Sequence, residues 1–429
     1  MAKYWLTRGQ EVFCGLLVGL TLPISMVASA EPAVVYIGLD SRFSDNVAKV
    51  KNNKESDLES RVYLGVRHTS DPGACKSDFA AQAAYRHWLD DTFSPETSAE
   101  MDFQGDCRLG ANLIWQASNY LRDVAQDRRV SGTPNDRTQK NVFRTGPVLT
   151  LRLNAVDELV LSAAYEDTEF REPEQTDGER VSGSLSWNHL FDPSFTAGLS
   201  AAIDRSELDT EEEIDRVTLG VPFTKTWALT ALSGSIGYGQ IETSLRDRPA
   251  EEYNTFVANL IAARQVNQTT EVELEASREL TDQTSDFDSR FEDFVFDLEQ
   301  TSAVEVTAIR LGVGKDFGGT ARLDLGFFGN RSDYLDTGAE EDVIGADVNY
   351  RRPITGQLTT TMAARYEYQT FSQDDSDDEL LRVSAGLEFR LNPQLDVISR
   401  VGFEQRTSEE VSREFEEGWV LVGVQYQFR

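Results

Sequence analysis

The chain has 429 residues, with 41 Lys and Arg against 73 Asp and Glu, which gives a net charge of −32. This acidity argues against a protein that binds nucleic acid phosphates, because such proteins need basic patches. Apolar residues make up 40% and charged residues 27% of the chain, which excludes a disordered, collagenous or coiled-coil protein. After residue 30 there is no run of about 18 apolar residues, so we expect no helical membrane span there, although spanning strands would escape such a search.

Residues 1–30 have the pattern of a secretory signal peptide. Lys3 and Arg8 are positively charged, residues 12–27 are largely apolar, and Ala28-Ser29-Ala30 follows with small side chains. A basic start, an apolar centre and a small-residue cleavage site are the three parts of such a signal. The sequence therefore predicts an exported mature protein, residues 31–429.

Two cysteines, Cys75 and Cys107, remain in the mature chain. They flank a candidate hairpin, residues 76–106, and antiparallel pairing would bring its two feet together as a disulfide requires. Exported proteins enter an oxidising compartment, so a disulfide is the expected state of the pair. The alternative, a metal site, is weak because neither CxxC spacing nor a histidine cluster accompanies the pair. We therefore expect no metal site, and no motif implies a cofactor.

From residue 139 to the end, the sequence alternates between apolar and polar residues. In residues 381–391, apolar residues such as Val383 and Leu387 alternate with polar ones such as Arg382 and Glu388. A period of two over this length indicates a strand with one apolar and one polar face. About fifteen such strands are expected from Asn141 onward. Less regular candidates precede them at 33–41, 57–68, 76–88, 98–107 and 111–122.

Short and long connections alternate between the expected strands. Short turns fall at sequences such as 154–157 and 392–394, and longer acidic connections at 207–215, 282–299, 374–379 and 409–417. This asymmetry is typical of an outer-membrane barrel with short periplasmic turns and long acidic extracellular loops. We predict that residues 31–429 form one all-β domain, a transmembrane antiparallel up-and-down β-barrel of about 20 strands (about 18–22). The alternative, a soluble two-sheet sandwich, does not need this many strands.

The cost of burying charge in lipid decides which face of each strand points outward. An Arg or Lys at the bilayer midplane costs about 2–4 kcal/mol, so the charged faces must point into the lumen. The candidates for lining the lumen are Arg144, Arg152, Glu158, Arg310, Arg322, Asp324, Arg365, Glu367, Arg382, Glu388, Arg390, Arg400 and Glu404. Mixed charges suit a water-filled lumen for a polar solute or an extended sugar chain. The alternative is that these charges pair with one another and hydrate the wall.

The acidic connections at 207–215 and 374–379 are rich in carboxylates, which Ca²⁺ prefers as ligands. They lack the glycine turn and the regular ligand spacing of a dedicated calcium loop, so a solvated outer face is the favoured interpretation. A weak effect of calcium on these loops stays open as a hypothesis.

The chain lacks the motifs of common enzymes. It has no GxSxG, HExxH, phosphate-loop or dinucleotide-binding sequence. Of the three histidines, His189 lies near an expected periplasmic turn, which is the wrong end of the barrel for a lipid hydrolase. We therefore expect no enzymatic activity.

Four features carry a resemblance to a known family. They are the signal peptide, an early strand that ends in Asp40-Ser41-Arg42-Phe43-Ser44-Asp45-Asn46-Val47, the strand Arg144-Thr145-Gly146-Pro147-Val148-Leu149, and a hairpin ladder that ends in Tyr426 and Phe428. In these the mature chain resembles the putative β-barrel porin type 2 family, found beside exopolysaccharide and PEP-CTERM/exosortase loci. One departure is Arg429, which follows the aromatic residue that usually ends the family's last strand. The resemblance implies a conduit in the outer membrane of a Gram-negative bacterium. Its implied partners are lipid, lipopolysaccharide and secreted exopolysaccharide or its export machinery.

Two functions from different classes stay open. The first is a porin-like channel for polar solutes or exopolysaccharide. The second is a structural or docking barrel with a plugged lumen, whose acidic loops bind an external partner. Residues 281–302 form the longest expected connection and contain Phe287, Phe291, Phe294 and Phe296. If this connection folds inward, it narrows the lumen.

Overall fold

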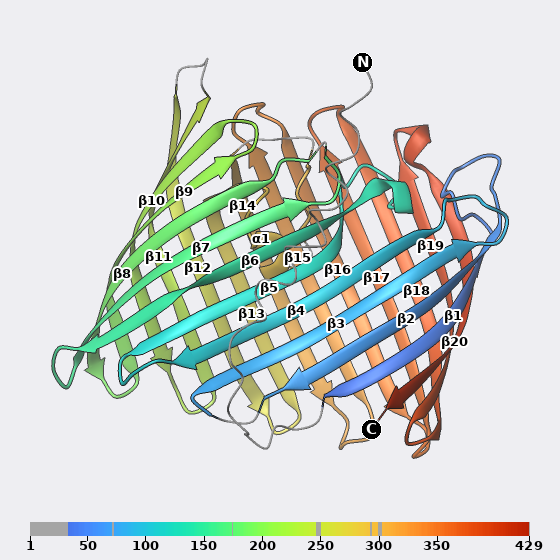
Figure 1. Cartoon of the computed structure of the whole chain (residues 1–429), viewed down its shortest axis with the longest axis horizontal. Coiled ribbons are helices and arrows are strands. Elements are labelled where there is room, and N and C mark those ends of the chain that lie inside the picture. The colour runs from blue at the N-terminus through green and yellow to red at the C-terminus, as the bar shows by residue number, and fades with distance from the viewer. Residues whose placement is uncertain are drawn as a thin grey trace, which may run out of the picture.

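The chain forms a closed barrel. The computed structural model describes residues 33–428, except 71–72, 174, 246–249, 292–293 and 299–302. The described strands make one sheet of 20 strands, and β1 pairs with β20 from Val35 opposite Phe428 to Ser44 opposite Trp419. Figure 1 shows the tilted strands running around one continuous wall. The predicted up-and-down barrel is confirmed, whereas the predicted signal peptide, residues 1–30, lies outside the described residues.

Every strand pairs antiparallel with its neighbour in the sequence. The first ten strands are β1 (Val34–Ser44), β2 (Asp57–Thr69), β3 (Cys75–Trp88), β4 (Glu96–Arg108), β5 (Leu113–Ala125), β6 (Arg137–Arg152), β7 (Asp157–Phe170), β8 (Gly178–Asp192), β9 (Phe195–Leu208) and β10 (Glu212–Thr226). The other ten are β11 (Thr230–Leu245), β12 (Glu251–Asn267), β13 (Thr270–Thr281), β14 (Val304–Asp316), β15 (Arg322–Tyr334), β16 (Glu340–Pro353), β17 (Leu358–Phe371), β18 (Ser376–Asn392), β19 (Leu395–Ser408) and β20 (Phe415–Phe428). The short helices are η2 (Pro134–Asp136), α1 (Phe287–Arg290) and η3 (Val411–Arg413). Within the described part of the chain, no helix is long and apolar enough to cross a bilayer.

Alternating side chains give the barrel an apolar outer wall. In β18, Val383, Leu387 and Leu391 are 43%, 47% and 52% exposed although they are large and apolar. On the opposite face of the strand, Arg382, which precedes Val383, and Glu388, which follows Leu387, form ion pairs instead. Large apolar side chains exposed all round a barrel indicate contact with lipid.

The short connections lie together at one end of the barrel. Between β6 and β7, Asn154 Oδ1 accepts hydrogen bonds from the backbone N–H groups of Val156 at 2.8 Å and Asp157 at 2.9 Å. Between β14 and β15, Gly318 and Gly319 have φ values of +61° and +75°, which glycine adopts without strain. In outer-membrane barrels this end is periplasmic, and the half of the barrel at the opposite end is called the outer half here.

Two of the acidic segments expected as connections, 207–215 and 374–379, are mostly strand in the structure. β9 continues to Leu208 and β10 begins at Glu212, so only residues 209–211 connect them. Asp and Glu disfavour strands, which is why the sequence suggested a longer connection. The hydrogen bonds of the ladder outweigh this preference, and Glu207 pairs directly opposite Glu213. Long connections at the outer end are 45–56, 126–136 and 282–303, of which the last is described in part.

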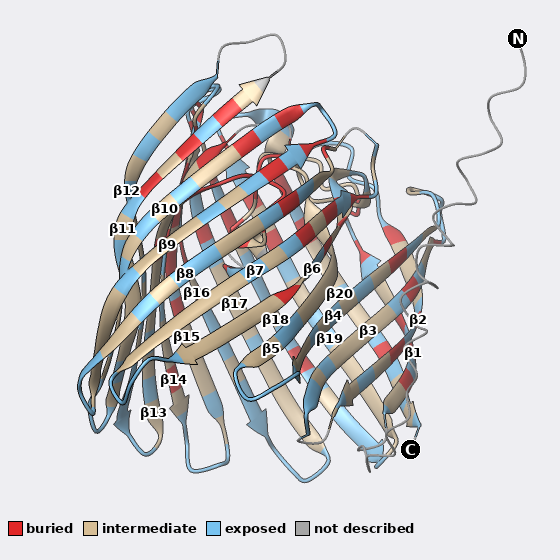
Figure 2. Cartoon of the chain, turned by 60° about the vertical axis from the view of Figure 1, so that its left-hand side comes forward, coloured by how far each residue is buried: buried red, intermediate tan, exposed pale blue. Residues whose placement is uncertain are grey.

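The interior of the barrel has two levels. Figure 2 shows buried residues gathered mainly in the outer half and on the chain inside it. On β14 the inward-facing residues Val304, Val306 and Ala308 are buried, and they are followed towards the periplasmic end by Arg310 and Gly312, which line a cavity. The outer level is therefore packed, and a polar cavity lies beneath it.

Candidate functional site

The described part of the connection 282–303, namely 282–291, 294–298 and 303, folds into the barrel, and we call this connection the plug loop. Figure 1 shows α1 inside the wall, and its Phe287 is fully buried. The rings of Phe287 and Phe291 stack with centroids 4.8 Å apart, and Phe294 meets Phe296 edge-on at 4.7 Å. These rings form one cluster with inward-facing wall residues of β7, β14 and β15, namely Phe170, Val304, Val306, Ala308 and Tyr334. Burying each aromatic ring contributes about 1.5–3 kcal/mol, which favours the inward position of the loop.

Buried ion pairs tie the plug loop to the wall. Lys140 of β6 donates hydrogen bonds from Nζ to the Ser285 carbonyl oxygen at 2.7 Å and to Asp288 Oδ1 at 3.0 Å. Arg180 of β8 forms an ion pair with Asp282, and both side chains are almost fully buried. Burial alone would raise the pKa of Asp282, but the Arg180 guanidinium and hydrogen bonds from Thr284 hold it below its ordinary value of 3.8.

Two further connections bend into the outer mouth. From residues 45–56, Lys49 reaches Glu404 of β19 at 3.0 Å. Residues 126–136 are held by Arg406 of β19, which donates to the carbonyl oxygens of Arg128 at 2.9 Å and Val130 at 2.8 Å. The Leu298 N–H of the plug loop donates to the Gln126 carbonyl oxygen at 2.8 Å, so the two connections also contact each other.

A charged cavity of about 1010 Å³ lies beneath the plug loop. Arg290 and Phe291 of the plug loop line it together with wall residues of several strands. The lining includes four of the predicted lumen residues: Arg310, Arg365, Arg382 and Glu404. Their charges are paired, since Arg310 lies 2.8 Å from Asp347 and Arg382 lies 3.1 Å from Glu404. The plug loop is therefore the ceiling of a polar chamber.

The other predicted lumen residues lie outside this chamber. Glu367 lines a cavity of about 470 Å³ beside residues 126–136, and Arg144 lines another of about 660 Å³ near β3 and β4. Towards the short turns, charges pair with close neighbours: Arg322 with Asp324, Arg390 with Asp396, and Arg400 with Glu388. Arg152 and Glu158 face each other across β6 and β7 at the last paired position.

The two cysteines lie at the periplasmic end. Cys75 and Cys107 occupy opposite positions on β3 and β4 and are joined by a disulfide. Neither lines the charged chamber. The disulfide therefore joins the feet of one hairpin, away from the plug loop.

The residues that anchor the plug loop, Lys140 and Arg180, are not among those predicted from the sequence. Lys140 precedes the strand expected from Asn141, and the strand period alone does not distinguish Arg180 from other polar positions. The sequence of β14 does contain a sign of the inward loop. Its lumen face is apolar at Val304, Val306 and Ala308 and becomes polar only from Arg310 onward. An apolar stretch on a lumen face predicts a second layer of chain packed against it.

Comparisons with known proteins agree with the barrel. Residues 338–428, which hold β16 to β20, match the family described as Putative beta-barrel porin 2. This match confirms the family resemblance. No curated protein matches the sequence.

Several solved structures resemble this barrel in fold. The FrpB iron transporter from Neisseria meningitidis, in its apoprotein form, has a TM-score of 0.51 and 8% identity, covering 93% of this chain and 82% of that chain. The siderophore receptor PirA from Pseudomonas aeruginosa has a TM-score of 0.45 and 11% identity, covering 93% and 80%. The outer membrane protein opdK from the same organism has a TM-score of 0.41 and 8% identity, covering 93% and 100%. At such identities the likeness concerns the fold alone.

Proposed function

We propose that this outer-membrane barrel is a channel for polar solutes whose outer mouth is narrowed by the plug loop. The observation that carries the proposal is the position of Arg290 and Phe291, which form the ceiling of a charged chamber inside the wall. A chamber lined by paired charges stays hydrated and offers no path for an apolar solute. The three connections at the mouth then regulate access to it.

Sugar chains are the solute class that fits this chamber. Guanidinium groups donate hydrogen bonds and carboxylates accept them. An ion pair such as Arg310 with Asp347 can therefore bind a sugar hydroxyl group either as acceptor or as donor. Trp419 also lines the chamber, and the guanidinium carbon of Arg42 lies over its ring at 5.1 Å from the centroid. The family resemblance points to secreted exopolysaccharide as the chain that passes. Export through a cleaved signal peptide, residues 1–30, is part of the same proposal.

Shortening the plug loop tests the proposal. Thr281 and Val304 are paired directly opposite each other, so an Asn-Gly turn can replace residues 282–303 and keep the β13–β14 hairpin. We expect the single-channel conductance in planar bilayers to rise several-fold, because the ceiling of the chamber is removed. The matched control replaces the connection 89–95 at the same rim, none of whose residues lines the chamber. This control should conduct like the full chain.

Two results would contradict the channel. Equal conductance of the full and shortened barrels would show that the plug loop does not limit the pore. A correctly folded, heat-modifiable barrel that stays silent in both forms would exclude conduction. Silence would favour the second candidate, a docking barrel, which is supported by the filling of the outer mouth by three connections.

A further inference from the structure

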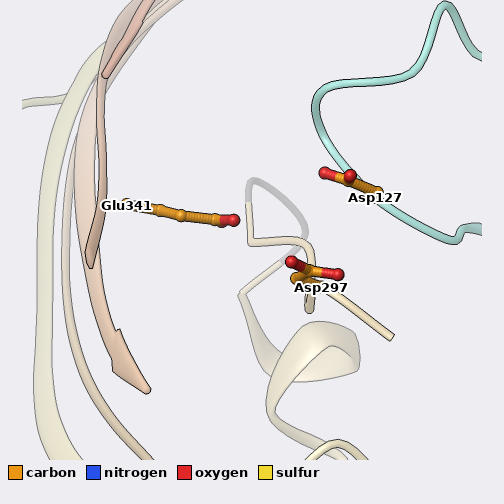
Figure 3. A group of neighbouring side chains, drawn as sticks. All are labelled: Asp127, Asp297 and Glu341. Atoms are coloured by element: carbon orange, nitrogen blue, oxygen red, sulfur yellow. The ribbon is translucent and has the colours of Figure 1, made fainter. Parts of the chain in front are cut away.

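Three buried carboxylates meet between the plug loop, a second connection and the wall. Asp127 lies in 126–136, Asp297 in the plug loop and Glu341 on β16, and each offers an oxygen within 4.8 Å of the other two. Their exposed fractions are 6%, 0% and 2%. Figure 3 shows Glu341 extending from the wall towards the two aspartates.

Among the described residues none forms a hydrogen bond with the Glu341 carboxylate, although Arg128 and Arg129 are close enough to attract its charge. Arg129 lies 2.7 Å from Asp127 and 3.1 Å from Asp297, and Arg128 lies 4.0 Å from Glu367. Both carboxylate oxygens of Glu341 are buried and accept no hydrogen bond from any described residue. A buried carboxylate in this state is strongly unfavourable unless a cation or a proton neutralises it.

We propose that Asp127, Asp297 and Glu341 bind one Ca²⁺ ion. Calcium takes oxygen ligands at 2.3–2.6 Å, so two oxygens on one ion are at most about 5.2 Å apart, which the 4.8 Å limit satisfies. Zinc sites usually include histidine or cysteine, and this cluster contains neither. Each carboxylate oxygen has two acceptor positions, so the bonds from Arg129 leave the aspartates able to coordinate the ion.

The ion joins three parts of the chain that are far apart in the sequence. It ties the plug loop and residues 126–136 to β16, close to where the Asp297 N–H donates to Tyr334 Oη at 2.8 Å. Calcium outside the cell therefore holds the plug loop in place, and its removal loosens the loop. An effect of calcium on conductance rests on the proposed function, because it requires the barrel to be a channel. The binding of calcium does not depend on that proposal.

Calorimetric titration of the full mature chain with CaCl₂ tests binding. The barrel is refolded in detergent without lipopolysaccharide, which itself binds divalent ions. We expect one saturable site in the wild type and a loss of affinity of at least about ten-fold in Glu341→Gln, which keeps the side-chain volume. Asp297→Asn is the second variant, and heat-modifiable gel mobility checks that both fold. The control with Glu207→Gln, Asp209→Asn and Glu213→Gln removes three exposed carboxylates at the outer end and should keep the site.

The outcomes separate the two proposals. Absence of a saturable site, or wild-type affinity in both Glu341→Gln and Asp297→Asn, would overturn the calcium site. In bilayers, EGTA should raise the conductance of the wild type to that of Glu341→Gln and leave the shortened barrel unchanged. If calorimetry shows binding but EGTA does not change the conductance of the wild type, the ion does not hold the loop, and that part of the proposal is overturned. Silence of every form, with binding intact, would refute the channel alone.

Discussion

Lys140 places an ammonium group inside the packed outer half of the barrel. Its side chain is 1% exposed and lies 5.2 Å from the ring centroid of Phe296. No water surrounds such a charge, so its stability depends on the Asp288 carboxylate and the Ser285 carbonyl oxygen. Lys140 is therefore one of the wall residues that anchor α1 in the lumen, together with Glu279 of β13, which pairs with Arg290.

Replacing this lysine should release α1. In Lys140→Met the Asp288 carboxylate loses its partner, and breaking a buried ion pair costs about 3–5 kcal/mol. We expect trypsin to cut after Arg290 faster than in the wild type, as followed by mass spectrometry of the fragments. The control is Arg205→Gln, which breaks the exposed Arg205–Asp215 pair. Equal cleavage in Lys140→Met and the control would show that Lys140 does not hold the loop.

The plug loop, taken as an element, is held by acids that stay charged inside the barrel. Burial would raise the pKa of Asp286, but the guanidinium groups of Arg290 in the loop and of Arg144 and Arg180 on the wall together outweigh burial and hold this pKa below 3.8. The same holds for Asp282 beside Arg180. A carboxyl with a depressed pKa stabilises the folded position above its unfolded pKa, and this stability disappears as pH falls through the depressed value.

The docked loop should therefore resist mild acid. We expect conductance to stay constant from about pH 7 to about pH 5 and to rise only below the ordinary aspartate value of about 3.8. The measurement is the current through the full chain as pH is lowered, with the shortened barrel as the control for pH effects on the wall. A rise that is complete at about pH 5 would mean that other groups hold the loop.

At the scale of the whole molecule, the barrel combines a strongly negative chain with a chamber of paired charges. The net charge is −32, while arginines such as Arg310 and Arg382 in the chamber have carboxylate partners. Unpaired acidic residues therefore dominate the field at the mouths, which attracts cations.

The shortened barrel should prefer cations at low salt. Across a KCl gradient near about 0.1 M, we expect a reversal potential whose sign shows a preference for K⁺ over Cl⁻. Near about 1 M we expect little selectivity, because the screening length falls from about 10 Å to about 3 Å. Selectivity for anions would contradict this expectation and indicate that the arginines of the chamber control permeation.

The amino-acid sequence by itself determined the wall. The alternation of Val383 and Leu387 with Arg382 and Glu388 sets two faces, because successive side chains of a strand point in opposite directions. Asn154 marks a turn because its side chain bonds to the backbone two and three residues ahead. These are local effects, so strands, turns and the barrel class could be predicted without a structure.

Only the tertiary structure decided what fills the barrel. The sequence marked residues 281–302 as able to narrow the lumen, but their inward position depends on partners far away in the chain, such as Lys140 for Asp288. For the same reason, neither the spacing of residues nor any sequence motif predicted that Asp127, Asp297 and Glu341 lie close together. Alternation assigns each side chain to a face, whereas the packing of a loop against that face depends on contacts that form only once the barrel has closed.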